Sequence, residues 1–160
     1  MILYSCWRED DLLRNERIDY FGNELRIDGF YYSYDQGKII NVIFLYRNGI
    51  YFLVNSDGKE RTNPDEVVTL LTKEHIERCK TNKVLWGIFL LNGNDILIEK
   101  WAFAGPGWKS TVIESGTILS DTSFIITKRN DSRAGNKEAV YEYFFYPHSP
   151  KPDSTNIFIK

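Results

Sequence analysis

His75 and Cys79 are the side chains of this sequence best suited to binding a metal ion. They stand four residues apart in a segment with helical spacing, so both would lie on one helix face, close enough to ligate one ion. Two ligands do not complete a site, and both residues belong to the apolar stripe of that segment. We interpret them as packed core residues and expect no cofactor. The second histidine, His148, is interpreted as a solvated surface residue.

Acidic side chains on strand-like segments are a second source of chemistry. Glu99, Glu114 and Glu142 each fall within a segment predicted to be a strand. Inside a barrel such a carboxylate is a costly buried charge, and two converging carboxylates can perform acid–base catalysis. A solvated, outward-facing position is favoured for each of the three. No Gly-x-Ser-x-Gly motif occurs, so we assign no catalytic residue and do not favour an enzyme.

Aromatic side chains are the candidates for a ligand-binding surface. The chain has 10 Tyr, 10 Phe and 4 Trp, most of which should pack in a core. Two Trp flank a Gly-Pro-Gly turn and are expected near one end of the fold, and ligand pockets are mostly apolar and aromatic. The predicted ligand-binding residues are Trp86, Trp101, Trp108, Tyr141 and Tyr143.

One loop carries a small positive spot. Lys128, Arg129, Arg133 and Lys137 accompany a single acid, Asp131. A contact with an anionic ligand or partner is one interpretation of this loop. A solvated hairpin end is favoured.

Length, composition and charge narrow the class of protein. The chain has 160 residues, with 20 Lys+Arg against 22 Asp+Glu and a net charge of -2. This length favours one domain, and the aromatic content excludes a disordered chain. The charge excludes a nucleic-acid binder, which needs a basic face. No apolar run reaches the roughly 18 residues that span a bilayer.

Turn signals divide the rest of the chain into strands and one helix. Asn48-Gly49 favours a type I′ hairpin turn. Asn63 and Pro64 are typical of a helix start, and the helix is expected to run over about 64–80, after the third strand. Gly116 suggests a bulge. The strands are expected over 26–34, 38–46, 50–55, 83–91, 96–103, 109–119, 122–129, 138–147 and 156–159.

Consecutive antiparallel strands in this number favour an up-and-down barrel of 8–9 strands, because closure removes exposed edges. A two-sheet sandwich is the alternative. Residues 25–160 resemble the calycin group of lipocalin-like barrels in strand count, meander order and aromatic content, although the Gly-x-Trp motif of lipocalins is absent. Residues 1–24 are expected to form an N-terminal tail, either a tether or a short packed helix.

Cys6 carries a second resemblance. Leu3-Tyr4-Ser5-Cys6 resembles the lipobox of bacterial lipoproteins, and the acidic residues that follow are similar to export tags of Bacteroidetes lipoproteins. A full signal includes an apolar stretch of about 7–15 residues, so this interpretation requires an upstream start. The resemblance implies lipidation at Cys6, membrane contact only through a lipid anchor, and a place in the cell envelope. A cytoplasmic protein is the alternative.

These observations lead to one favoured function and two alternatives. We expect a non-enzymatic envelope lipoprotein whose barrel binds a small apolar or amphipathic ligand, without nucleic acid. The first alternative is a structural or partner-binding envelope protein with a filled barrel. The second is an enzyme that uses carboxylates inside the barrel.

Overall fold

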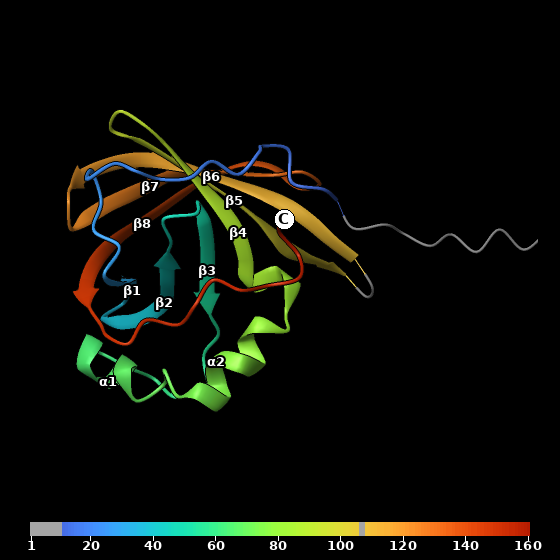
Figure 1. Cartoon of the computed structure of the whole chain (residues 1–160). Coiled ribbons are helices and arrows are strands. Elements are labelled where there is room, and N and C mark those ends of the chain that lie inside the picture. The colour runs from blue at the N-terminus through green and yellow to red at the C-terminus, as the bar shows by residue number, and fades with distance from the viewer. Residues whose placement is uncertain (1–10, 106–107) are drawn as a thin grey trace, which may run out of the picture.

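Eight antiparallel strands form a closed barrel in the computed structural model, which describes residues 11–105 and 108–160, without the side chains of Ala104 and Trp108 (Figure 1). Each strand pairs with the next in the chain, and β1 also pairs with β8. The elements are β1 (Gly29–Asp35), β2 (Lys38–Leu45), β3 (Ile50–Val54), α1 (Pro64–Val68), α2 (Lys73–Lys80), a 3-10 turn η1 (Lys83–Leu85), β4 (Trp86–Asn92), β5 (Asp95–Gly105), β6 (Trp108–Ser120), β7 (Ser123–Asp131) and β8 (Gly135–Pro147). The predicted mainly-β meander is confirmed, and the closed barrel is compatible with a lipocalin-like fold.

Two details of the sequence prediction change. Asn48 does not have a positive φ, whereas Gly49 does, at 72°. The Gly49 N–H donates to Tyr46 O and the Tyr46 N–H donates to Ile50 O, so the β2–β3 connection is a three-residue loop with a left-handed glycine rather than a type I′ turn. Residues 156–159 do not form a ninth strand.

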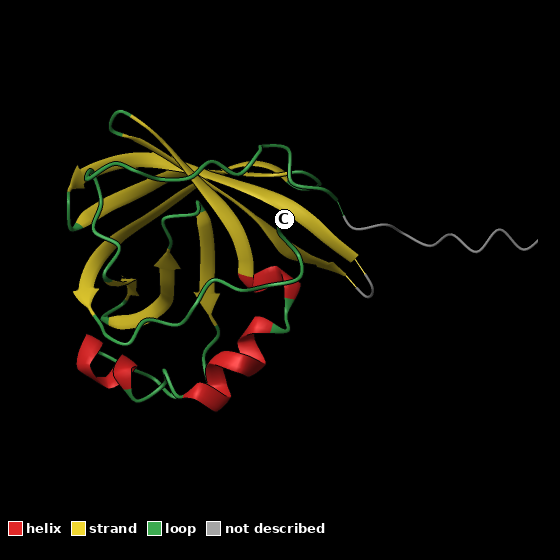
Figure 2. Cartoon of the chain, in the orientation of Figure 1, coloured by secondary structure: helices red, strands yellow, loops and turns green. Residues whose placement is uncertain are grey.

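The helical segment after β3 is confirmed but is divided in two (Figure 2). Asn63 caps α1, its side chain accepting from the Asp65 N–H at 2.7 Å. Thr72 caps α2 in the same way, accepting from the His75 N–H at 3.3 Å. α1 ends at Val68, and α2 begins after Thr72, whose backbone has the extended geometry of an N-cap residue.

The barrel wall separates two hydrophobic cores. The interior core lies inside the barrel and includes Tyr31, Tyr51, Phe89, Phe124 and Tyr143. The outer core lies between the outer face of β1–β4 and the segments that cover it, and it includes Phe30, Phe44, Phe52, Val67, Ile76 and Trp86. Strand residues alternate between the two faces, so one chain segment supplies both cores.

The N-terminal segment, residues 11–28, runs along the outside of the barrel wall and then places side chains in the interior core. Asp11 accepts a hydrogen bond from the Trp101 indole at 2.7 Å, and the Tyr20 N–H donates to Arg47 O. Tyr20 and Leu25 then enter the interior core. Residues 11–28 contain no helix. No helix within the described ranges is long and apolar enough to cross a membrane.

Candidate functional site

The interior core is filled by aromatic side chains. Phe124 and Tyr143 stack with ring centroids 4.7 Å apart, and Tyr31 lies 5.2 Å from Phe124. All three side chains are at most 2% exposed. The Tyr20 hydroxyl accepts a hydrogen bond from the Leu25 N–H at 2.8 Å. The Tyr20 N–H donates to Arg47 O and the Arg26 N–H donates to Asp121 O, so Tyr20 and Leu25 form a plug at the end of the barrel where these two turns lie.

Charged side chains occupy the interior at a distance from this plug. The Glu114 carboxylate is held from two sides: Lys100 Nζ donates to Oε2 at 2.8 Å and Arg129 Nη1 donates to Oε1 at 3.0 Å. Glu114 is 2% exposed, whereas the Arg129 side chain is 31% exposed, so the ionic cluster of Lys100, Glu114 and Arg129 has a buried carboxylate and a partly exposed guanidinium. A buried carboxylate needs such partners, because removal from water is costly unless the charge is paired.

Two tyrosines adjoin the ionic cluster. The Tyr51 ring lies 5.4 Å from Lys100 Nζ and is completely buried. Its hydroxyl has no hydrogen-bond partner among the described residues. Burial raises the pKa of Tyr51 and of Tyr143 far above the ordinary value, so both hydroxyls stay protonated and can donate.

The structure places the three strand carboxylates differently from the prediction. Glu142 is exposed, as expected, but Glu99 is fully buried and Glu114 nearly so; a solvated position was wrong for these two. Glu99 points outward and is covered by the N-terminal segment, where the Arg14 and Asn15 N–H groups donate to it at 2.6 and 2.9 Å. The two buried carboxylates lie on opposite sides of the wall and do not share a cleft.

The structure describes four of the predicted ligand-binding side chains and divides them between the two cores. Trp86 stacks on Phe52 at 4.3 Å in the outer core, and its indole donates to Lys80 O. Trp101 also belongs to the outer core, under Asp11. Tyr143 is packed inside the barrel, and Tyr141 is half-buried against the same core. The Trp108 side chain and Cys6 lie outside the described residues.

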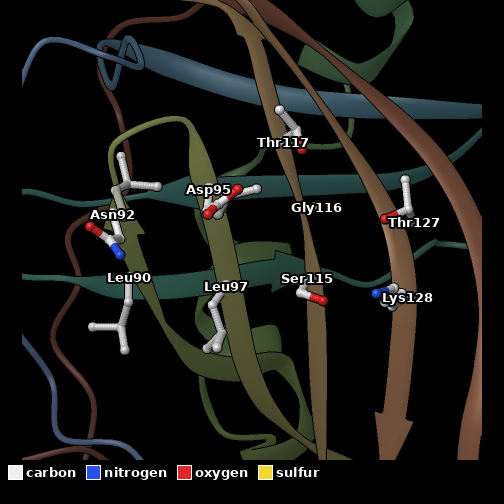
Figure 3. Close-up of a pocket in the computed structure, with 11 residues that line it drawn as sticks. Leu90, Asn92, Asp95, Leu97, Ser115, Gly116, Thr117, Thr127 and Lys128 are labelled. Carbon is white, nitrogen blue, oxygen red and sulfur yellow. The ribbon is translucent and has the colours of Figure 1, made fainter.

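A groove runs over the outer face of β4–β8 and consists of two adjoining hollows. The first has a volume of about 530 Å³ and is lined by Leu90, Asn92, Leu97, Ser115, Thr117 and Thr127 among others (Figure 3). The second, of about 590 Å³, adds Ile113, Asn130, Asn136, Lys137 and Glu138. Leu97, Ser115 and Lys128 line both hollows, so we describe them together as the outer groove.

Two irregularities of the sheet coincide with the outer groove. The β6–β7 register shifts between Ser115 and Gly116, and the β7–β8 register shifts between Ile126 and Lys128. A Cβ on Gly116 would stand 1.7 Å from Ile125 O, so the backbones approach too closely there for any side chain. The irregularity that Gly116 suggested is confirmed. The floor residues of the groove, Leu97 and Ile113, carried no sequence signal.

The basic loop residues are distributed rather than clustered. Arg129 points into the barrel, and Arg133 Nη2 donates to Asp11 at 3.0 Å. Lys128 and Lys137 remain at the rim of the outer groove. The sequence thus identified two residues at the rim of the groove, Lys128 and Lys137. It did not predict the ion pair between Arg129 and the buried Glu114.

The histidines are packing residues. His75 Nε2 donates to Asn55 O at 2.8 Å, while Nδ1 accepts from Arg78 Nη2 at 2.8 Å. Both ring nitrogens are engaged, and no group of metal-ligating side chains forms within residues 11–105 and 108–160. His148 is half-buried against Phe30 rather than solvated, and burial lowers its pKa.

A comparison of the chain with protein-family models, curated proteins and solved structures returned no match.

Proposed function

We propose that this protein is a non-enzymatic binding module that takes up a small amphipathic ligand in the outer groove. The observation that carries the proposal is the groove on a barrel whose interior core is filled. Its two hollows, of about 530 and 590 Å³, fall within the roughly 300–1,000 Å³ typical of small-molecule sites.

The chemistry of the groove favours an amphipathic rather than a purely apolar ligand. Leu97 and Ile113 supply an apolar floor, and Ser115 supplies a hydroxyl group. Lys128 and Lys137 line one part of the groove and can donate to an acceptor group on the ligand. A short acyl chain with a carboxylate head matches this arrangement, because the chain would cover the floor and the head would meet a lysine.

A titration with sodium decanoate, followed by amide shifts in ¹⁵N-labelled protein, tests the site. We expect shifts at Leu97, Ser115 and Lys128, and about tenfold weaker binding in an Ile113→Ser variant, since one lost apolar contact is worth about 1–3 kcal/mol. Leu119→Ser is the matched control because Leu119 is exposed on β6 but is not among the residues that line the groove. Shifts confined to interior residues such as Tyr141 would contradict the groove and favour the barrel mouth.

A partner-binding role for a filled barrel is the second candidate. Its support is the exposure of two large apolar side chains, Phe103 at 73% and Val140 at 71%. Isolated exposed residues are common, but both strands that carry them belong to the long β5–β8 wall. Sedimentation of wild type and a Phe103→Ser, Val140→Ser double variant tests this role. Concentration-dependent self-association that the double variant abolishes would support it, and monomers in both would count against it.

The envelope location remains part of the proposal. Its support is the lipobox-like Leu3-Tyr4-Ser5-Cys6, which precedes the point where Asp11 is bonded to the barrel. Metabolic labelling with a lipid precursor, in a bacterial host and from a gene that includes the upstream region, tests it. Label in wild type but not in Cys6→Ser supports a lipoprotein, and an unlabelled wild type removes the anchor from the proposal.

A further inference from the structure

The Tyr51 hydroxyl is a buried donor that the fold leaves unused. Tyr51 is 0% exposed, and its hydroxyl finds no hydrogen-bond partner in the part of the chain that the structure describes. Buried hydroxyls almost always have a partner, whether protein, ordered water or ion. The Tyr51 ring stands beside the Lys100 ammonium, which places the unused donor next to the ionic cluster.

Donors outnumber acceptors at this place. Each Glu114 oxygen accepts one hydrogen bond, Oε2 from Lys100 and Oε1 from Arg129. An ammonium has three N–H donors and a guanidinium has five, so the two cations retain unused donors after these contacts. The nearby Ser33 hydroxyl accepts from Asn41 Nδ2 at 2.9 Å. This end of the interior therefore has more donors than acceptors.

The ionic cluster also has more positive than negative charge. Lys100 and Arg129 carry two positive charges against the single carboxylate of Glu114. The side chains of Lys100 and Glu114 are only 12% and 3% exposed, so water screens them poorly, whereas Arg129 is 31% exposed and partly solvated. Tyr143 lies close enough to interact electrostatically with both Lys100 and Glu114. Its hydroxyl stays protonated, so it adds no negative charge. An unbalanced charge in a low-dielectric interior attracts a counter-ion.

We propose that the barrel interior binds one small monovalent anion between the Tyr51 hydroxyl and the Lys100 ammonium. An anion that only accepts hydrogen bonds fits a donor-rich place better than water, which must donate as well. The packing limits its size: Ser33 and Ser110 are at most 1% exposed and Tyr143 is 2% exposed. We expect an occupant of halide or formate size on the interior side of the wall; Arg129 of the ionic cluster also lines the second hollow of the outer groove.

Bromide identifies such a site directly because it scatters anomalously and water does not. We expect crystals of the wild-type chain grown in sodium bromide to show one anomalous peak inside the barrel, within about 3.5 Å of Tyr51 Oη and Lys100 Nζ. A data set in which this place holds only a water, or nothing, overturns the proposal.

Thermal unfolding tests the site in solution with a matched pair of variants. We expect the Tm of wild type to rise by several degrees more between 10 and about 300 mM sodium bromide than in sodium gluconate of equal ionic strength. Tyr51→Phe removes one donor without changing the ring, and it should lose at least half of this bromide-specific rise. Tyr46→Phe should keep it, because Tyr46 has the other buried hydroxyl without a described partner but belongs to the outer core. An equal loss in both variants, or no bromide-specific rise in wild type, contradicts the anion site.

Discussion

Glu99 and Glu114 lie on neighbouring strands of the barrel and are buried on opposite sides of its wall. Glu114 is paired in register with Ile98, one residue from Glu99. The Glu114 carboxylate enters the interior, where two cations hold it. The Glu99 carboxylate faces outward and accepts hydrogen bonds from neutral donors of Arg14 and Asn15 in the N-terminal segment. Glu114 therefore links strands on the inside of the barrel wall, and Glu99 holds the N-terminal segment against its outer face.

Replacing the Glu99 carboxylate should release the N-terminal segment. In Glu99→Gln an amide NH₂ must face donors from Arg14 and Asn15, and we expect a loss of about 2 kcal/mol in the free energy of unfolding. Urea denaturation measures this loss. Glu142→Gln is the control, since Glu142 is exposed and its replacement should change stability by less than about 0.5 kcal/mol. Equal stability of the two variants would show that Glu99 does not hold the segment.

Gly116→Ala should disturb the β6–β7 pairing. A Cβ at this position would stand 1.7 Å from Ile125 O, a backbone atom that cannot rotate away. We expect a loss of about 2 kcal/mol in the free energy of unfolding and amide shifts along the outer groove. Gly58→Ala is the control for a glycine without close neighbours; its φ of 86° gives only the cost of a left-handed backbone, about 1 kcal/mol. A Gly116→Ala chain as stable as wild type would mean that the two strands are not in close contact there.

Lys151 should make the protein more stable as the pH rises from 8 to 9.5. Its amine donates to Ile27 O and Leu45 O, and burial lowers the pKa of Lys151 from 10.5 to about 8. Between these two pKa values the unfolded chain binds a proton that the folded chain does not, so the free energy of unfolding rises with pH, by about 1.5 kcal/mol over this window. A neutral amine still donates to both carbonyls, so the contacts persist.

Comparison with Lys151→Met isolates this effect. Burial raises the pKa of Cys79, which works in the opposite direction near pH 9, but Cys79 is present in both chains and cancels in the difference. Urea denaturation at pH 8.0, 8.75 and 9.5 should give a rising difference in the free energy of unfolding between wild type and variant. A constant difference would show that Lys151 keeps an ordinary pKa in the folded protein.

Local sequence patterns predicted most of the barrel. Turn signals and strand-like composition identified the strands from β1 to β8, and Asn63-Pro64 located the start of the helical segment. Both signals are local, because turns and helix caps depend on residues within a few positions of one another. The subdivision at Thr72 depends on the same capping chemistry, and a second N-cap signal at that position could have identified it.

The candidate sites depended on contacts that no local pattern contains. The partners of Glu99 stand 84 and 85 residues away, and Arg129 stands 15 residues from Glu114. Whether Trp86 lies at a ligand site or in a core depends on which face of β4 the α2 segment covers. The sequence by itself determined the order of the strands and the position of the helices. Only the tertiary structure decided which carboxylates are buried, since burial depends on segments that closure of the barrel brings together from distant parts of the chain.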